Sequence, residues 1–331
     1  MAMDKILADW KKKTFKPVYW LEGEEEYYID KLVDYAEHKI LLENEASFNL
    51  MIFYGRDANW ADIINACRKY PMFSDFQVVI LKEAQHLKEI DKLGAYIQNP
   101  QPSTIFIVAY KEKKLDSRTK FAKLVKDKTV LLSTKKMYDS ALPEWVNNMV
   151  QTKGYTITPK ANLLLVEHIG NDLVRMEKEI EKILINLNKR TAVTEEDIEK
   201  YVGISKEYNI FEFQSAIAHK DMVKAMRIAQ YFGSNPKAAP LPYLLPTLYT
   251  FFSKVYMMYG IKGSDSDVAR EIGVSPFFIK DYVKASKNYG FAGTEKILLL
   301  LHQYNLKSIG VNSIKPNDES LLKEIMAKVM M

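Results

Sequence analysis

The sequence has one cysteine and five histidines among 331 residues. Cys67 cannot form a disulfide within the chain, and the histidines are too scattered to supply the ligands of a structural zinc ion. We therefore expect no metal and no cofactor. Cys67 falls in a helical pattern, where a cysteine is usually a small packing residue.

Long apolar runs are missing as well. Residues 297–301 form one of the longest, far below the roughly 20 residues of a membrane-spanning helix, and residues 1–13 are too polar for a secretory signal. We expect a cytoplasmic chain without membrane contact. The composition, 47% hydrophobic and 27% charged, excludes a disordered or fibrous protein, and the length is enough for two or three domains.

Short apolar segments alternate with helical patterns in the first part of the chain. Strands are predicted at residues 18–21, 47–54, 78–81, 104–109 and 129–132, and helices at 27–42, 60–69 and 118–126. Such alternation is typical of a parallel sheet covered by helices on both faces. The sequence therefore predicts an α/β domain that ends near residue 140.

Strand patterns stop after Pro143 and helical periodicity takes over. Four helices that fit a small bundle are predicted at 143–153, 160–169, 173–187 and 195–202. Thr158 opens the second of them, and Thr194 with Asp197 caps the fourth. From residue 209 a further all-helical block is predicted, with helices at 211–218, 221–232, 241–259, 266–272, 276–285, 293–308 and 318–330. The aromatic and methionine-rich stretch 241–258 indicates core or subunit packing.

An α/β domain directs attention to nucleotide binding at the carboxyl ends of its strands. The turn after the first strand, residues 22–26, reads EGEEE. A phosphate-binding loop needs several glycines, a lysine and a hydroxyl, whereas this turn has one glycine and four glutamates that repel a phosphate. The strand ending at Leu81 continues with Lys82, where a magnesium-binding aspartate would sit. The outline of an ATPase is thus present without its catalytic groups.

Two alternatives stay open at this point. One is an active nucleotide hydrolase, although the sequence has no G-x-S-x-G turn and no H-E-x-x-H pair, so we assign no catalytic residues. The other is a DNA-binding regulator, because Ala269, Gly273 and Ile279 have helix-turn-helix spacing. The second helix of that unit starts with Phe277 and Phe278, which suit packing better than base reading.

Positive charge is concentrated between residues 111 and 136. Ten basic and three acidic residues give this segment a net charge of +7, whereas the whole chain has +5. It is either a solvated helix face or a surface that faces phosphate groups. The candidate phosphate contacts are the basic residues at its start, Lys111, Lys113, Lys114, Arg118 and Lys120.

One loop is unusually apolar. Tyr70, Met72 and Phe73, followed by Phe76, lie between a predicted helix and a predicted strand, where polar residues are expected. Packing against the loop's own domain would account for one or two of them. Adaptable methionine and aromatic side chains on a connecting loop are typical of an anchor for a protein partner, which is the interpretation we favour.

Together these features resemble the delta subunit family of the bacterial DNA polymerase III clamp loader. No single motif carries the resemblance; the order and spacing of several do, over nearly the whole chain. They are VYWLEGEE at 18–25, PMFS at 71–74, VVILK at 78–82, KLDSR at 114–118 and GNDL at 170–173, with IF at 210–211, AI at 216–217 and the turn at 232–236.

The resemblance implies three domains. Residues 1–140 would form a degenerate AAA+-like domain without a functional phosphate loop, 141–208 a small helical lid and 209–331 a helical collar for oligomerisation. It also implies a subunit of the polymerase holoenzyme that binds and opens the ring-shaped sliding clamp, the beta subunit. Its other partners would be further clamp-loader subunits in a hetero-pentamer and primed DNA. The clamp-binding residues would be Tyr70, Met72 and Phe73.

Overall fold

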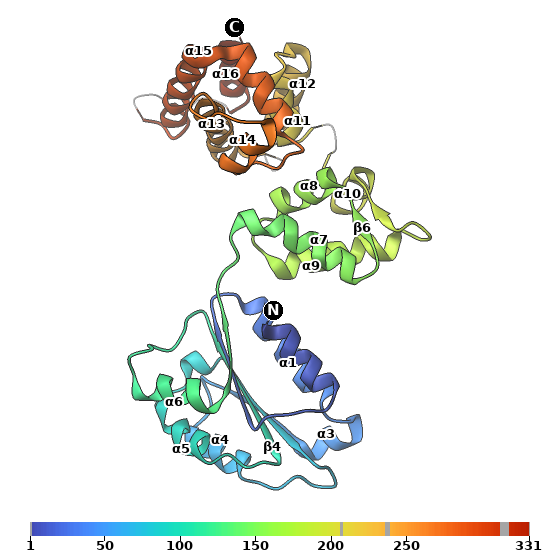
Figure 1. Cartoon of the computed structure of the whole chain (residues 1–331), viewed down its shortest axis with the longest axis vertical. Coiled ribbons are helices and arrows are strands. Elements are labelled where there is room, and N and C mark those ends of the chain that lie inside the picture. The colour runs from blue at the N-terminus through green and yellow to red at the C-terminus, as the bar shows by residue number, and fades with distance from the viewer. Residues whose placement is uncertain (1, 206–207, 236–238, 312–317, 331) are drawn as a thin grey trace. The chain divides into compact units, whose positions relative to one another are not determined.

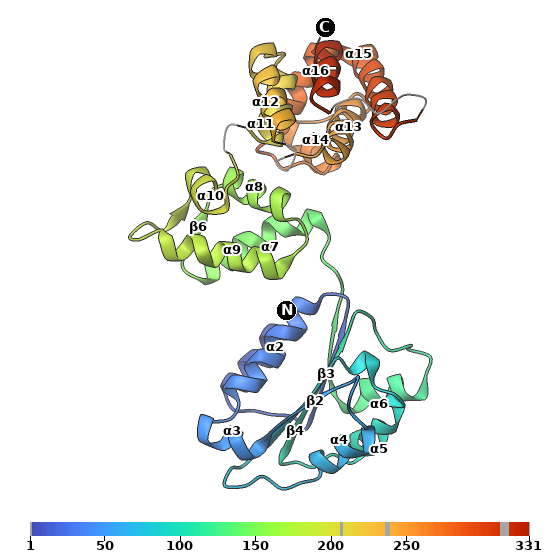
Figure 2. The same cartoon turned by 180° about the vertical axis from the view of Figure 1, so that it is seen from behind.

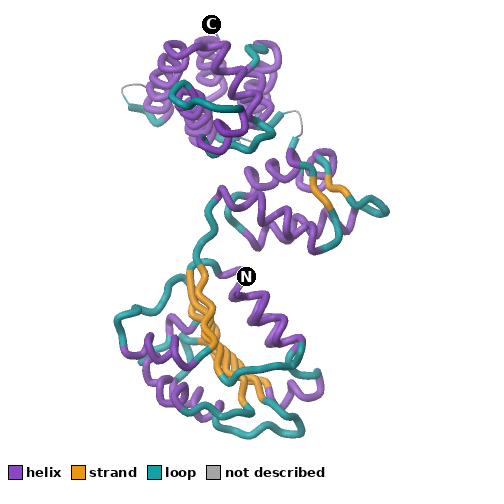
Figure 3. The backbone as a smooth tube through the Cα atoms, in the orientation of Figure 1, coloured by secondary structure: helices purple, strands orange, loops and turns teal. Residues whose placement is uncertain are grey.

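The computed structural model of the chain describes residues 2–205, 208–235, 239–311 and 318–330. The chain divides into two compact units, Met1–Tyr138 and Asp139–Met331. Figure 1 shows the elements of each unit. The first unit contains the large sheet, and the second is mainly helical (Figure 3).

Five parallel strands form the sheet of the first unit in the order β2-β3-β4-β1-β5. They are β1 (Val18–Gly23), β2 (Leu50–Tyr54), β3 (Gln77–Lys82), β4 (Thr104–Lys111) and β5 (Val130–Thr134). The three central strands are buried over nearly their whole length, as their unbroken apolar runs require. The predicted fold class, a parallel α/β sheet followed by helices, is confirmed.

Helices cover both faces of this sheet. Figures 1 and 2 show α1 (Ala2–Lys11) and α2 (Glu26–Lys39) on one face and α4 (Trp60–Cys67), α5 (Gly94–Gln98) and α6 (Lys120–Lys128) on the other. Neighbouring residues of β1 point to opposite faces. The ring of Tyr19 packs on Trp10 of α1 at 5.0 Å between centroids, and that of Trp20 packs on Phe121 of α6 at 5.5 Å.

One prediction for the first unit is wrong. The strand predicted at 47–54 begins only at Leu50, because the preceding residues form α3 (Glu43–Asn49). The side chain of Glu45 accepts a hydrogen bond from the backbone N–H of Leu42 at 3.0 Å and so closes the start of α3. Helices α1 and α5 and the short 3-10 turns Ala84–His86 and Ile90–Leu93 add to the predicted set.

The second unit begins with the 3-10 turn Asp139–Ala141 and the four predicted helices, α7 (Leu142–Thr152), α8 (Pro159–Ile169), α9 (Leu173–Asn186) and α10 (Glu195–Val202). Both predicted caps are present: the hydroxyl of Thr158 accepts from the N–H of Ala161 at 3.2 Å, and the N–H of Thr194 donates to Asp197 at 2.9 Å. The expectation of no strand after Pro143 is wrong, since β6 (Thr156–Ile157) pairs in parallel with β7 (Ala192–Val193). Two-residue strands are too short to produce an alternating pattern.

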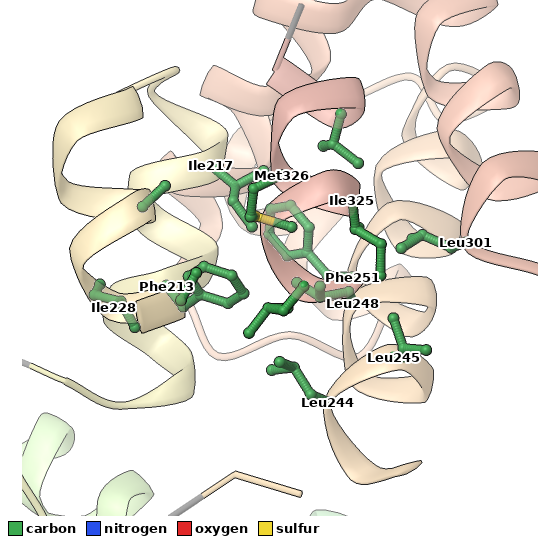
Figure 4. Packing of buried hydrophobic residues seen from close by; sticks show 14 of the residues in the cluster. Phe213, Ile217, Ile228, Leu244, Leu245, Leu248, Phe251, Leu301, Ile325 and Met326 are labelled. Atoms are coloured by element: carbon green, nitrogen blue, oxygen red, sulfur yellow. The ribbon is translucent and has the colours of Figure 1, made fainter. Parts of the chain in front are cut away.

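One apolar core is shared by α11 (Ile210–Ala218), α12 (Met222–Ser234), α13 (Leu241–Met258), α15 (Ile279–Ser308) and α16 (Asp318–Met330). Figure 4 shows Phe213, Leu248 and Ile325 packing together from three of them. The short helix α14 (Asp265–Glu271) packs in a separate small core. The predicted helix 276–285 starts later, at Ile279, and continues into the next predicted helix across a break at Gly290, where φ is 65°. Residue 236 of the predicted turn lies outside the described residues.

Candidate protein-binding site

Tyr70, Met72 and Phe73, called the apolar tip from here on, lie in the loop between α4 and β3. Phe73 is 93% exposed, Tyr70 78% and Met72 53%. The chain is buried on both sides of the loop: Cys67 at the end of α4 and Val78 near the start of β3 have no exposed surface. Apolar side chains in water gain free energy when a partner covers them. The tip is therefore chemically suited to enter an apolar pocket on another molecule.

Hydrogen bonds hold the base of this loop. Gln77, the first residue of β3, is 2% exposed, and its Nε2 donates to the carbonyl of Lys69 at 2.6 Å and to Oγ1 of Thr104 at 2.7 Å. The Thr104 hydroxyl in turn donates to the carbonyl of Cys67 at 2.8 Å. These contacts satisfy carbonyls at the end of α4 that have no partner inside the helix. The tip thus extends from a well-supported base.

Phe76 does not belong to the tip. Its ring packs on Phe15 at 5.4 Å between centroids, and both residues are half-buried. Of the four apolar residues seen in the sequence, one therefore packs within the unit and three face solvent.

Asn49 is a residue of this site that could not be recognised from the sequence. It is 1% exposed at the end of α3 and hydrogen-bonds the backbone of Met72, 23 positions away, so no local pattern connects the two.

The turn at Gly23 lies at the opposite, carboxyl edge of the sheet. There Oε1 of Glu25 accepts a hydrogen bond from the N–H of Tyr27 at 3.3 Å, at the start of α2. A bound phosphate would accept hydrogen bonds from a helix N-terminus in this position. Burial raises the pKa of the Glu25 carboxyl, and the backbone N–H groups of Tyr27 and Met137 offset part of that rise. The carboxyl group of Glu25 thus occupies the position at the start of α2 where a bound phosphate would accept hydrogen bonds.

Gly23 and Glu22 have structural roles in this turn. A Cβ on Gly23 would lie 2.2 Å from the carbonyl oxygen of Thr134, so the close approach of β5 requires glycine. Glu22 is buried, and its Oε2 accepts hydrogen bonds from Nε1 of Trp20 at 3.1 Å and from the N–H of Leu115 at 3.2 Å. Residues that resemble part of a phosphate loop therefore hold the end of β1 in place.

The basic residues named from the sequence differ in how far their charge is already compensated. Nζ of Lys111 lies 2.6 Å from Asp30, and although burial lowers its pKa, the neighbouring carboxylates raise it overall. Arg118 is exposed but pairs with Asp116 at 2.7 Å. Within the described part of the chain, the other three have no ion pair; they are Lys113, Lys114 and Lys120.

The helix-turn-helix candidate packs within the second unit. Phe278 stacks on Phe211 of α11 with 4.8 Å between ring centroids and 8° between ring planes. Val268, Ala269 and Ile279 form part of a small core beneath it. Because Phe278 is used for packing, the start of this second helix presents little that could read base edges.

Ser215, His219 and Asp281 meet in the second unit without forming a catalytic triad. The Ser215 hydroxyl donates to Oδ1 of Asp281 at 3.3 Å, and Nδ1 of His219 lies 2.9 Å from the backbone carbonyl of Ser215. The hydroxyl therefore faces a carboxylate and not an imidazole that could act as its base.

Cys67 is not suited to nucleophilic catalysis either. Burial raises the pKa of its thiol, which disfavours a nucleophilic thiolate. Among the described residues, no group of three or more His, Cys, Asp or Glu side chains could hold a metal ion.

Residues 19–135 match the family model described as DNA polymerase III, delta subunit. The chain is similar to DNA polymerase III delta subunits. DNA polymerase III subunit delta of Bacillus subtilis is 22% identical to it over 331 residues, covering 97% of this chain and 94% of the relative. A probable DNA polymerase III subunit delta from Aquifex aeolicus is also 22% identical and is matched over 83% of both chains.

The solved structure of the Bacillus subtilis DNA clamp loader delta protein superposes with a TM-score of 0.55 at 22% identity, covering 100% of this chain and 99% of the other. The two chains thus share a fold. These matches confirm the resemblance to clamp-loader delta subunits that the sequence motifs indicated. The range matched by the family model, residues 19–135, contains the apolar tip, the Gly23 turn and the basic residues 111–120. None of the chain's described helices is long and apolar enough to cross a membrane.

Proposed function

We propose that this chain is the clamp-loader subunit that binds and opens the ring-shaped DNA sliding clamp, the beta subunit, during replication in the cytoplasm. Tyr70, Met72 and Phe73 bind the clamp. The observation that carries the proposal is the apolar tip itself, with Phe73 93% and Met72 53% exposed on a loop whose base is held by buried hydrogen bonds. Aromatic and methionine anchors of this kind dominate the energy of many interfaces.

The size of the tip is sufficient for a specific contact. Burial of a Met or Phe side chain contributes roughly 2 to 3 kcal/mol, so Met72 and Phe73 together contribute about 5 kcal/mol. At 25 °C this amounts to about a few thousandfold in affinity. Tyr70 extends the same surface, and we expect a smaller contribution from it because it lies at the edge of the loop, three residues after the end of α4.

Opening of a closed ring requires more than affinity. A ligand that binds the closed and the open clamp equally well does not change their ratio. We infer that the tip anchors the clamp while the rest of residues 1–140 holds the open interface apart. A fluorescence pair placed across one clamp interface reports opening separately from binding. If the wild-type chain binds the clamp but leaves that signal unchanged, the chain binds without opening.

The other partners follow from the same proposal. Residues 209–331 form the collar that joins further clamp-loader subunits in a hetero-pentamer, and residues 141–208 form the lid. Those subunits supply the energy of ATP, because this chain fills its own helix N-terminus with Glu25 and lacks the lysine of a phosphate loop. Primed DNA contacts the basic segment through phosphate groups, from residues among Lys111, Lys113, Lys114, Arg118 and Lys120.

The deciding experiment measures clamp affinity of the full-length chain carrying Met72→Ala and Phe73→Ala together. We expect a loss of about a thousandfold, read by calorimetry or by failure to co-purify with the clamp of the same organism. Tyr138→Ala is the matched control, since Tyr138 is 82% exposed in the same unit but lies away from this loop in the sequence. Binding of the double variant within twofold of wild type would remove the assignment.

A further inference from the structure

We propose that Asn49 is a positioning residue that holds the apolar tip in its binding conformation before any partner arrives. This inference rests on the proposed function, because it concerns the same site. Asn49 belongs to α3 and not to the loop itself, and its side chain is buried. Figure 2 shows α3, which ends at Asn49, at the same end of the first unit as the loop that follows α4.

The contact between Asn49 and the tip uses both functional groups of the amide. Oδ1 of Asn49 accepts from the backbone N–H of Met72 at 2.7 Å, and Nδ2 donates to the carbonyl of Met72 at 2.8 Å. Nδ2 also donates to the carbonyl of Glu45 at 3.1 Å, which fixes the orientation of the side chain on α3. Only an amide of this length offers both a donor and an acceptor to one backbone residue.

These are the only hydrogen bonds that attach residues 70–75 to the rest of the described chain. The supporting contacts of Gln77 act on the end of α4, and Phe76 packs on Phe15 beyond the tip. Asn49 therefore holds the centre of the loop, whereas the other contacts hold its two ends. Because Asn49 is 1% exposed, its amide group is shielded from water, which strengthens the two bonds.

The backbone at the tip needs such a restraint. Phe73 has a φ of 55°, in the left-handed region that non-glycine residues rarely adopt. The carbonyl of Met72 belongs to the planar peptide group that leads into Phe73, so its orientation helps to set that φ. By holding this carbonyl, Asn49 favours a conformation that directs the Phe73 ring outward, where it is 93% exposed. Strained backbone of this kind is typical of functional sites.

Preorganisation has a defined effect on binding. If only a fraction of molecules has the binding conformation, the apparent affinity falls by that fraction. Without the two Asn49 bonds, the loop samples conformations in which Met72 and Phe73 are not presented together. We expect Asn49→Ala to weaken clamp binding about tenfold, an intermediate effect compared with removal of the side chains that make the contact.

The test combines Asn49→Ala, Phe73→Ala and both changes in the full-length chain, with clamp affinity as the readout. Asn49→Ala alone weakens binding about tenfold, whereas in the Phe73→Ala background its further effect is smaller, because one of the two anchors that it positions is already gone. Asn162→Ala is the matched control: Asn162 is also a buried amide that donates to a backbone carbonyl, that of Pro143, in the second unit. It should bind like wild type.

The outcomes separate this inference from the proposed function. If Phe73→Ala loses binding while Asn49→Ala stays within twofold of wild type, the positioning role is wrong and clamp binding by the tip stands. If Phe73→Ala also stays within twofold, the proposed function is wrong. Hydrogen exchange of the wild-type chain gives a result even if Asn49→Ala does not fold. The Met72 amide should be strongly protected, and exchange at the rate of an open loop would overturn the inference.

Discussion

The carboxyl group of Glu25 accepts a hydrogen bond from the backbone N–H of Tyr27 at 3.3 Å, so the first helix after β1 is capped by the chain itself. In nucleotide-binding α/β proteins the same helix terminus receives a phosphate. A carboxylate in that position competes with any anionic ligand, and the neighbouring glutamates of the turn add repulsion.

This arrangement predicts that the full-length chain does not bind Mg-ATP at millimolar concentration. Calorimetry or fluorescent-nucleotide titration checks the prediction. Glu25→Gln is the informative variant, because it removes the negative charge without supplying the lysine that a phosphate loop needs. We expect no binding for either protein. A dissociation constant in the micromolar range for wild type would instead favour the nucleotide hydrolase.

Two substitutions of Phe73 are predicted to differ in stability but not in clamp affinity. Because its φ is 55°, Phe73→Gly relieves left-handed strain and should stabilise the first unit by about 1 kcal/mol relative to Phe73→Ala, which keeps it. Both variants lose the ring and should lose clamp affinity equally. Thermal unfolding and clamp titration on the same samples measure the two effects. A glycine variant that unfolds at a lower temperature than the alanine variant would contradict this view of the backbone.

The basic residues are predicted to contribute unequally to DNA binding. Affinity for a primed duplex should fall steeply with salt, and each lost phosphate contact should reduce the slope of log affinity against log salt by about one. Lys120→Ala should show this reduction, whereas Arg118→Ala should change the slope less, since Arg118 is already paired with Asp116 at 2.7 Å. A flat salt response of the wild-type chain would identify the segment as a solvated face.

Asp197 is predicted to make the second unit sensitive to acid. It is 2% exposed, and although burial raises its pKa, hydrogen bonds from Arg190 and Thr194 lower that pKa overall. A carboxyl with a lowered folded-state pKa stabilises the fold fully above its unfolded pKa of about 3.9, and this contribution is lost as the pH falls through the folded value. Asp197→Asn should therefore cost about 1 kcal/mol at pH 7 and less near pH 3.

Thermal unfolding followed by circular dichroism at the two pH values measures this difference. Asp172→Asn serves as the control, because Asp172 caps α9 through the N–H of Arg175 at 2.9 Å but is exposed. The control should show a smaller cost at pH 7, since an exposed cap loses less on substitution than a buried one. Equal costs for Asp197→Asn at both pH values would show that its charge is not the stabilising feature.

Much of the fold could be predicted from residues that are close in the chain. The apolar run of β3 is buried on both faces, and Thr158 and Thr194 cap helices where their spacing predicted it. The error at residues 47–49 has a local cause. Phe48 lies two residues before Leu50 and so extends the alternating pattern of β2, but Glu45 closes a helical turn that a two-residue period does not reveal.

Residue types and short spacings were sufficient to indicate a parallel sheet, a helical remainder, a degenerate phosphate turn and an apolar loop, because strand propensity, capping and charge repulsion act between near neighbours. Exposure could not be predicted in this way, since it depends on residues far along the chain. Long-range packing on Phe15 removes Phe76 from the loop surface, a buried amide at Asn49 holds Met72, and carboxylates on α2 compensate Lys111. These long-range contacts determine which side chains remain exposed or uncompensated and can therefore bind a partner.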